Sequence, residues 1–404
     1  MDLDALTTQV DDLLRNADRA LARDYPGERP TRQPIHTVYI PADQYDAESV
    51  GQWGREAETA VLTHAEVFLD AIGGDEDLLE RVLEKLAREP IEDLRIDFED
   101  GYGPRDDDEE DAAATAAGEA LRDSRKHGES SPFAGIRFKS FDPRTRHRGL
   151  RTLYLFLSAL GEIPEGFTVT LPKVTSVDQV DAMVKVAKAM EREVGGRLLF
   201  ELQIETPQSI LGTDGTALVA KMIHASRNRC LGLHYGTYDY SAFCAVPASQ
   251  QSLEHPVADH AKAIMQTAAA GTGVRLSDGS TNVLPVGDDG QMRTAWDNHL
   301  RLVRRALDRG FYQGWDLHPA QLASRYAATY EFFVDGFRDS VDRLKKYVEH
   351  TGSAVLDEPA TARAMADFCL RGMDCGAFTI DEVSRHSGLD GDTLAELALR
   401  PTAE

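Results

Sequence analysis

The 404-residue chain carries 68 acidic and 44 basic side chains, which gives a formal net charge of −24 at pH 7. This charge argues against general binding of nucleic acid or anionic membranes, because affinity for phosphate comes mainly from clustered Lys and Arg. The four cysteines have no CxxC spacing, no apolar run approaches the ~20 residues of a membrane span, and the N-terminus lacks a leader pattern. We therefore expect a cytoplasmic protein without disulfides, a zinc site or membrane contact.

In chain order, the first predicted element is an amphipathic helix over residues 1–22, with Leu3, Leu6 and Val10 on one face. A linker rich in Pro and charge follows. From His36 to about Lys346, eight short strand-like runs each precede a helical segment. The expected strands are 36–45, 93–100, 134–141, 167–174, 197–207, 230–241, 280–287 and 312–319, and the seventh has the weakest pattern.

Eight strand–helix units fit a (β/α)8 TIM barrel, which typically takes ~250 residues and more with insertions. A doubly wound open sheet is the alternative, but no GxGxxG follows any expected strand, so a dinucleotide fold has no positive support. We expect an N-terminal helix and linker over 1–35, a catalytic barrel over 36–346, and a helical C-terminal lid or extension over 347–404.

Charged side chains gather where the expected strands end, and the active site of a TIM-barrel enzyme lies at these carboxyl ends. Because strand residues two apart point the same way, Asp97 should share a face with Glu99, and Arg137 with Lys139. The charged residues at the strand ends are Asp97, Glu99, Asp100, Arg137, Lys139, Lys173, Glu205 and Asp239.

This ring of carboxylates and bases permits two interpretations. Carboxylates that face a pocket bind a hard divalent cation or move protons, and Mg²⁺ typically takes one or two of them together with water and substrate oxygens. Glu205 and Asp239 end adjacent strands and could serve in this way. The alternative is a structural lattice of salt bridges with Arg137 and the two lysines, and the pattern alone leaves both open.

Several segments resemble signatures of the citrate lyase beta subunit and malyl-CoA lyase group, within the aldolase/citrate lyase family. The resemblance extends over about residues 36–370. The segments occur in the expected order: IDFEDGYGP, GIRFKSF, LPKVTSVDQV, LQIETPQSIL, LGLHYGTYDYSAF, GWDLHPAQLA and VLDEPATARA.

The resemblance implies a barrel enzyme dependent on Mg²⁺, or Mn²⁺ in its place, that makes or breaks a carbon–carbon bond. Its substrate would be a 2-oxo acid or a CoA ester of the malyl or citramalyl type, and the enzyme a homo-oligomer. Glu205 and Asp239 would be the metal ligands, and Arg137 would hold the substrate carboxylate through its planar fork. The remaining implied site residues are Glu99 and Asp100 beside the metal waters or Arg137, the lid aspartate Asp357, and the substrate contacts Lys139, Gly236 and Thr237.

Some positions differ from the family pattern. Ala42 and Gln44 replace a Gly and an Arg near the expected coenzyme A phosphates, which leaves room for an aldolase of free 2-oxo acids. Lys173 is interpreted as an ion-pair residue rather than a Schiff-base lysine, and His318 as a structural hydrogen-bonding group. Two further alternatives are a non-catalytic or partner-dependent lyase subunit and a phosphoenolpyruvate-type phosphotransferase barrel.

Overall fold

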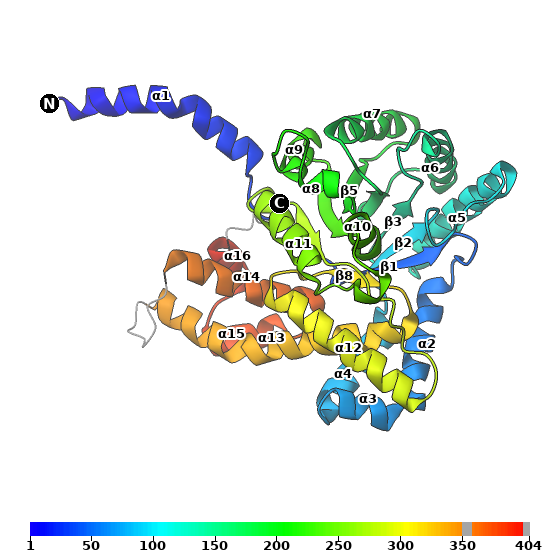
Figure 1. Cartoon of the computed structure of the whole chain (residues 1–404). Helices are drawn as coiled ribbons and strands as arrows, with labels where there is room; N and C mark the ends of the chain where they lie inside the picture. Colours follow the sequence, from blue (N-terminus) through cyan, green and yellow to red (C-terminus); the bar gives the residue numbers. More distant parts are fainter. Residues whose placement is uncertain (350–357, 399–404) are drawn as a thin grey trace.

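A barrel of eight parallel strands forms the centre of the computed structural model, which describes residues 1–349 and 358–398 (Figure 1). Neighbouring strands follow the order β7-β6-β5-β4-β3-β2-β1-β8. A bridge between Ser277 and Gln313, and a hydrogen bond of 2.8 Å from the Asp278 amide to the Gln313 carbonyl, join β7 to β8 and close the ring. The strands are β1 (His36–Pro41), β2 (Asp93–Asp97), β3 (Phe133–Arg137), β4 (Phe167–Leu171), β5 (Leu199–Ile204), β6 (Cys230–Tyr235), β7 (Arg275–Ser277) and β8 (Gly314–Asp316).

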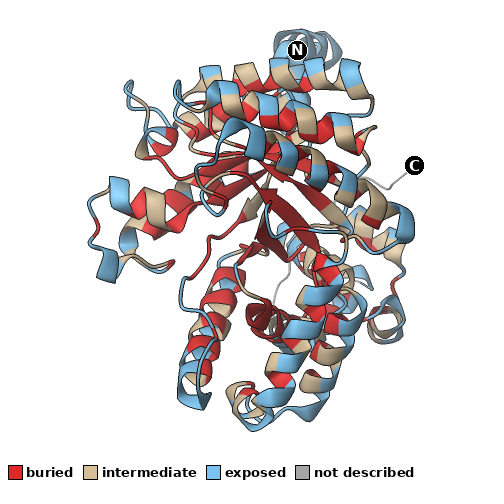
Figure 2. Ribbon diagram, turned by 90° about the vertical axis from the view of Figure 1, so that its right-hand side faces the viewer, coloured by how far each residue is buried: buried red, intermediate tan, exposed pale blue. Residues whose placement is uncertain are grey.

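Helices surround the barrel and bury one face of each strand, so the expected TIM-barrel fold is confirmed (Figure 2). The starts of two helices follow from the sequence. Ser176 and Asp288 each precede a helix, and their side chains accept a hydrogen bond from a backbone amide in its first turn. The helices are α1 (Leu3–Asp24), α2 (Ser49–Thr63), α3 (Ala65–Ala71), α4 (Glu76–Arg88), α5 (Asp107–His127), α6 (Arg146–Leu160), α7 (Val177–Val194), α8 (Pro207–Ile210), α9 (Leu218–Ala225), α10 (Thr237–Phe243), α11 (Pro256–Ala269), α12 (Asp289–Asp308), α13 (Pro319–Val348), α14 (Pro359–Cys375), α15 (Ile380–Ser387) and α16 (Gly391–Leu397).

The interior of the barrel is charged. Leu94 and Ile96 of β2 pack in the apolar core, whereas Arg95 between them is buried against carboxylates. Its guanidinium lies 2.7 Å from Asp93 and 2.9 Å from Glu201, so the buried charge is paired. Strand β2 therefore delivers its polar side chains to the barrel axis and, at its end, to the mouth.

The seventh strand lies earlier in the chain than the sequence pattern predicts. It spans Arg275–Ser277 and pairs with β6, whereas residues 280–287 have no strand. The prediction was wrong because Val283, Leu284 and Val286 look like a strand but lie exposed on the loop after it. The three residues of β7 carry too weak a pattern to outweigh this apolar loop.

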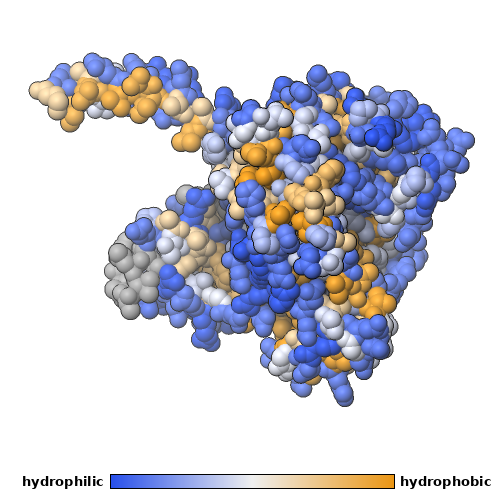
Figure 3. Space-filling view, in the orientation of Figure 1, coloured by the Kyte–Doolittle hydropathy of each residue, from blue (hydrophilic) through white to orange (hydrophobic). Residues whose placement is uncertain are grey.

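Helices extend the barrel at both ends of the chain, as expected. Helix α1 projects from the body, and none of its residues is buried, so its apolar side lies open in the space-filling view (Figure 3). At the other end, α14 and α15 pack on the 30-residue helix α13, and α16 packs on α14. In the described part of the chain, no helix is both long and apolar enough to cross a membrane.

Candidate active site

The carboxyl ends of β2 to β6 bring most of the predicted site residues together at the mouth of the barrel. Arg137, the last residue of β3, is the central cation there. Its Nε and Nη2 lie 2.6 and 2.7 Å from the two carboxylate oxygens of Asp97, the last residue of β2. The same carboxylate accepts from the amides of Glu99 and Gly101, at 3.0 and 2.8 Å. Each carboxylate oxygen of Asp97 thus accepts two hydrogen bonds. Asp97 holds one edge of the Arg137 guanidinium in place.

Two further contacts hold the rest of the Arg137 guanidinium. It lies over the ring of Tyr39, 4.6 Å from the centroid, and its Nη1 lies 3.4 Å from Gln203 Oε1. Nη1 is also 3.8 Å from Glu99. The Nη1 side therefore faces the polar groups of the mouth, and Arg137 lines the cavity there.

Glu205, directly after β5, is a buried carboxylate with only 1% of its surface exposed. It accepts hydrogen bonds of 2.7 Å from the Lys173 amide and from Gln203 Nε2. Lys173 has a positive φ of 51°, an uncommon backbone conformation for a residue with a side chain. Burial, followed by the charges of Asp239 and Glu99, raises the pKa of Glu205 well above its ordinary value.

A second carboxylate pair lies beside Glu205. Lys173 Nζ forms an ion pair with Glu99 and binds both Asp100 oxygens, at 2.7 and 2.9 Å. Burial, together with the charge of Asp100, raises the pKa of Glu99 to about 7. Burial also acts to raise the pKa of Asp100, but the Lys173 contact outweighs it and the pKa is lowered. Glu99 can therefore hold or release a proton near neutral pH.

The donor set at Glu205 suits a hard divalent cation. In residues 1–349 and 358–398, no Lys, Arg or His forms an ion pair with this buried carboxylate, and Asp239 and Glu99 add negative charge beside it. Nor does any group of three or more His, Cys, Asp or Glu side chains in these residues form a metal-binding set. A cation here would take Glu205, Asp239 and oxygens of water or substrate, which is the usual coordination of Mg²⁺.

Comparisons with known proteins agree with this architecture. The family described as "Domain of unknown function (DUF6986)" matches residues 14–401. The chain belongs to this family. No curated protein matches it.

Among solved structures, a citrate lyase from Burkholderia xenovorans LB400 matches 89% of this chain and 97% of its own, with 18% identity and a TM-score of 0.61. A Haloferax volcanii malate synthase, solved as a lead(II) complex, matches 91% of this chain and 98% of its own, with 14% identity and a TM-score of 0.50. These likenesses confirm the resemblance of this DUF6986 chain to citrate lyase-type proteins, and at such identities they establish the fold alone.

Not every predicted site residue of the DUF6986 chain reaches the mouth. Lys139 lies beyond the end of β3 and points to α5, where its Nζ is 2.6 Å from the buried Glu110 and 2.9 Å from the Phe98 carbonyl. The expectation that it shares the face of Arg137 was wrong, because strand alternation ends where β3 ends. Gly236 and Thr237 lie next to Glu205 and Ser280. Asp357 lies outside the described residues.

Several residues of the mouth were not anticipated. Gln203 binds both Arg137 and Glu205, and its place two residues before Glu205 in β5 was the available signal. Tyr39 packs against Trp315 with the two rings tilted by 37° and their centroids 4.8 Å apart, and both residues line the mouth cavity of about 620 Å³. His318 accepts a hydrogen bond from the Ala320 amide as the N-cap of α13, which agrees with its structural interpretation.

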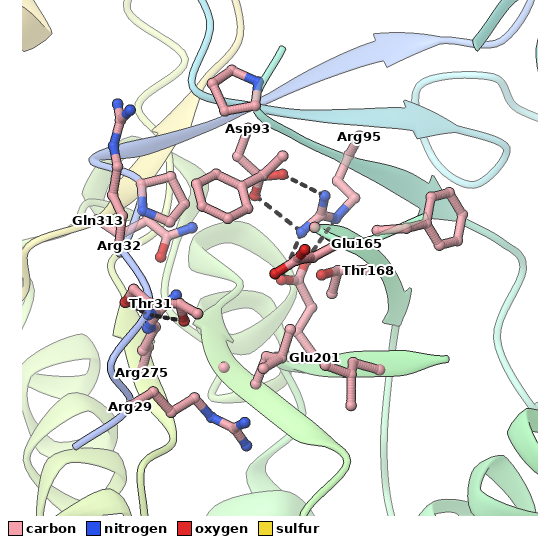
Figure 4. A pocket seen from close by; sticks show the side chains of 18 of the residues that line it. Arg29, Thr31, Arg32, Asp93, Arg95, Glu165, Thr168, Glu201, Arg275 and Gln313 are labelled. Atoms are coloured by element: carbon pink, nitrogen blue, oxygen red, sulfur yellow. Dashed lines mark hydrogen bonds and ion pairs between the residues drawn. The ribbon is translucent and has the colours of Figure 1, made fainter. Parts of the chain in front are cut away.

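A cavity of about 540 Å³ lies at the opposite end of the barrel, beneath the segment 29–34 (Figure 4). Figure 4 shows the Arg95 guanidinium held between Asp93 and Glu201 on its inner wall. Arg29 binds the carbonyls of Gly273 and Cys230. The charges of the inner wall are thus satisfied within the protein, so we place the chemistry at the carboxyl end instead.

Proposed function

We propose that this protein is a Mg²⁺-dependent carbon–carbon lyase that acts on a 2-oxo acid through an enolate. The observation that carries this proposal is the buried Glu205 carboxylate, which has a raised pKa, lacks an ion-pair partner among the described residues, and lies beside Asp239 near Arg137. A buried carboxylate of this kind is costly to ionise unless a cation pairs with it.

The roles follow from the positions of the side chains. The Nη1 side of Arg137 binds the substrate carboxylate, and Asp97, Gln203 and Tyr39 keep the guanidinium in place. A divalent cation held by Glu205 and Asp239 would supply Lewis-acid stabilisation to the negative charge that develops on the keto oxygen. Glu99, with a pKa of about 7 and Lys173 beside it, holds or moves the proton at this end of the site.

Two alternatives are less well supported. A Schiff-base aldolase needs a neutral lysine amine. At Lys173, burial acts to lower the pKa, but Glu99 and Asp100 outweigh it and raise the pKa above its ordinary value. A phosphotransferase needs cations around the transferred phosphoryl group. The mouth offers Arg137 and Lys173, and each already pairs with carboxylates.

Enolisation provides a direct test that needs no knowledge of the second substrate. We expect the methyl protons of pyruvate to exchange with deuterium in the presence of protein and Mg²⁺, as followed by proton NMR. A chelator should stop the exchange and added Mg²⁺ should restore it. Glu205→Gln and Asp239→Asn should each lower the rate by at least about 100-fold, because each removes a ligand charge.

Matched controls are Glu119→Gln and Asp123→Asn on α5, where Glu119 is exposed and the Asp123 side chain is half-buried. They should exchange at the wild-type rate. Wild-type exchange in the Glu205→Gln or Asp239→Asn protein, or exchange that persists without a divalent cation, would exclude the proposed mechanism.

A further inference from the structure

The mouth cavity is larger than a three-carbon 2-oxo acid needs, and it extends sideways from Arg137 across β1 and β8 to α2. We call its outer part the tail pocket. The residues of the tail pocket are Gln44, Gln52, Trp53, Glu56 and His318.

The tail pocket offers hydrogen-bond acceptors on α2. Gln52 Nε2 donates to Glu56 Oε1 at 2.7 Å, so the two exposed side chains meet on α2 and Glu56 Oε2 is left to accept from a ligand. No Lys or Arg of the described residues forms an ion pair with Glu56. The carboxylate is therefore a strong acceptor without a competing cation.

His318 supplies a donor on the other wall. Its Nδ1 accepts from the Ala320 amide at 3.2 Å, so the neutral ring carries its proton on Nε2. Burial lowers the pKa of His318 despite the opposing charge of Glu56, so the ring is neutral at pH 7. Its Nε2–H is then a donor, and the Gln44 amide adds both a donor and an acceptor.

These groups select among possible substrate tails. A phosphate or nucleotide tail would meet Glu56 and find no Lys or Arg in the tail pocket. An ammonium tail could donate to Glu56 but could not accept from His318. A hydroxyl group does both, and the indole of Trp53 can cover the apolar face of a short carbon chain.

We propose that the tail pocket binds a chain of hydroxyl-bearing carbons, so that the substrate is a polyhydroxylated 4-hydroxy-2-oxo acid without coenzyme A. This inference rests on the proposed function. In the cleavage, the C3–C4 bond breaks and the C4 hydroxyl loses its proton, so C4 becomes the carbonyl of a hydroxylated aldehyde. The electron pair of the bond forms the enolate of pyruvate, which then takes a proton at C3.

The test follows the reaction in the condensing direction. Pyruvate, Mg²⁺ and one aldehyde are supplied, and kcat/KM is compared for glyceraldehyde and erythrose against acetaldehyde and propionaldehyde. We expect a preference of at least about tenfold for the hydroxylated aldehydes, the usual worth of one charge-assisted hydrogen bond. In Glu56→Ala the KM for glyceraldehyde should rise by at least about tenfold, and the preference should fall toward one.

Glu58→Ala is the matched control, because Glu58 is on the same helix but lines a groove on its other side, against α4. It should retain the wild-type preference. Gln44→Ala provides a second variant at an exposed loop position, and a thermal melt checks the fold of each protein. An unchanged preference in both Glu56→Ala and Gln44→Ala would contradict the inference.

Two outcomes separate this inference from the function on which it rests. If the wild-type protein exchanges the pyruvate methyl protons but uses acetaldehyde as well as glyceraldehyde, the tail pocket is wrongly assigned and the lyase function stands. Cleavage of a malyl-type CoA ester at a comparable kcat/KM would also overturn the inference. If the wild-type protein does not exchange these protons, the proposed function itself fails.

Discussion

At the scale of single residues, Gly236 determines how closely β6 approaches Glu205. A Cβ atom at position 236 would lie 2.4 Å from the Glu205 Cβ and 2.6 Å from Glu205 Oε2, nearer than real Cβ contacts allow. Gly236→Ala should therefore displace the Glu205 carboxylate and weaken Mn²⁺ or Mg²⁺ binding by about tenfold or more, as disturbed ligand orientation does. Isothermal titration calorimetry measures this effect.

The control is Gly290→Ala in the first turn of α12, where the new Cβ would make ordinary contact at 3.4 Å. It should bind the cation like the wild type. Wild-type affinity in Gly236→Ala would mean that Glu205 is not a ligand, or that the strand can shift without cost.

Arg137 gives a second prediction at this scale. Its guanidinium forms two hydrogen bonds to Asp97 on one edge and faces the mouth with the other, a geometry that a lysine ammonium does not reproduce. Arg137→Lys should lower kcat/KM by about 100-fold or more, measured as pyruvate release or condensation. Arg151→Lys, an exposed partner of Asp111, should change nothing. An equal fall in both variants would place Arg137 among structural residues.

The sequence allowed Glu205, Asp239, Arg137, Glu99 and Asp100 to be chosen before the structure, because they stand at strand ends and match family motifs. The structure brings them together at one mouth, although their catalytic roles stay predictions. Which partner each carboxylate takes was not predictable. That Asp97 pairs with Arg137, whereas Glu99 and Asp100 pair with Lys173, depends on loop geometry that no local pattern encodes.

At the scale of elements, β8 is attached to its surroundings by one buried carboxylate. Asp316 binds Arg325 of α13 at 2.8 Å, His36 of β1 at 3.0 Å and His299 of α12 at 3.2 Å. Asp316→Asn keeps the shape of the side chain but removes its negative charge, so the buried Arg325 guanidinium loses its ion-pair partner. We expect the free energy of unfolding to fall by ~3–5 kcal/mol, the usual cost of breaking a buried pair. Urea denaturation measures it, and Asp308→Asn at the exposed end of α12 is the control.

The same carboxylate predicts a dependence of stability on pH. Burial acts to raise the pKa of Asp316, but Arg325, His299 and His36 outweigh it and hold the pKa well below 3.8. A carboxyl group whose pKa is lower in the folded protein than in the unfolded chain stabilises the fold at pH values above its unfolded pKa. This stabilisation is lost as the pH falls below about 3.8. Between pH 5 and 3, wild-type unfolding free energy should therefore fall more steeply than that of Asp316→Asn. Parallel curves would contradict this assignment.

Element prediction located seven of the eight strands, the three-residue β8 included, and misplaced β7. Strand β5 alternates apolar and polar residues over the five positions from Phe200 to Ile204, which the sequence pattern reveals. Strand β7 has three residues, and its position depends on pairing with β6 rather than on its own composition. The apolar loop after it was a stronger local signal than the strand itself.

At the scale of the whole molecule, the count of eight strand–helix units was sufficient to predict a barrel, because connections between parallel strands are helical and right-handed. The sequence predicted a helical segment between β1 and β2, but not its division into α2, α3 and α4, which is an insertion into the first strand–helix unit. This insertion places α2 over the mouth, where its side chains form one wall of the tail pocket. The fold was thus predictable, whereas the shape of the site depended on a tertiary arrangement.

The junction of β7 and β8 has a consequence for how the native barrel opens. One bridge and a few backbone hydrogen bonds join these strands, whereas β2 pairs with β1 over four residues and with β3 over five. Local opening should begin at this seam, because fewer hydrogen bonds break there. Peptides containing Asp278 and Gln313 should take up deuterium faster than those containing Leu94 and Ile96, as measured by mass spectrometry. Equal uptake would mean that the barrel opens as one cooperative unit.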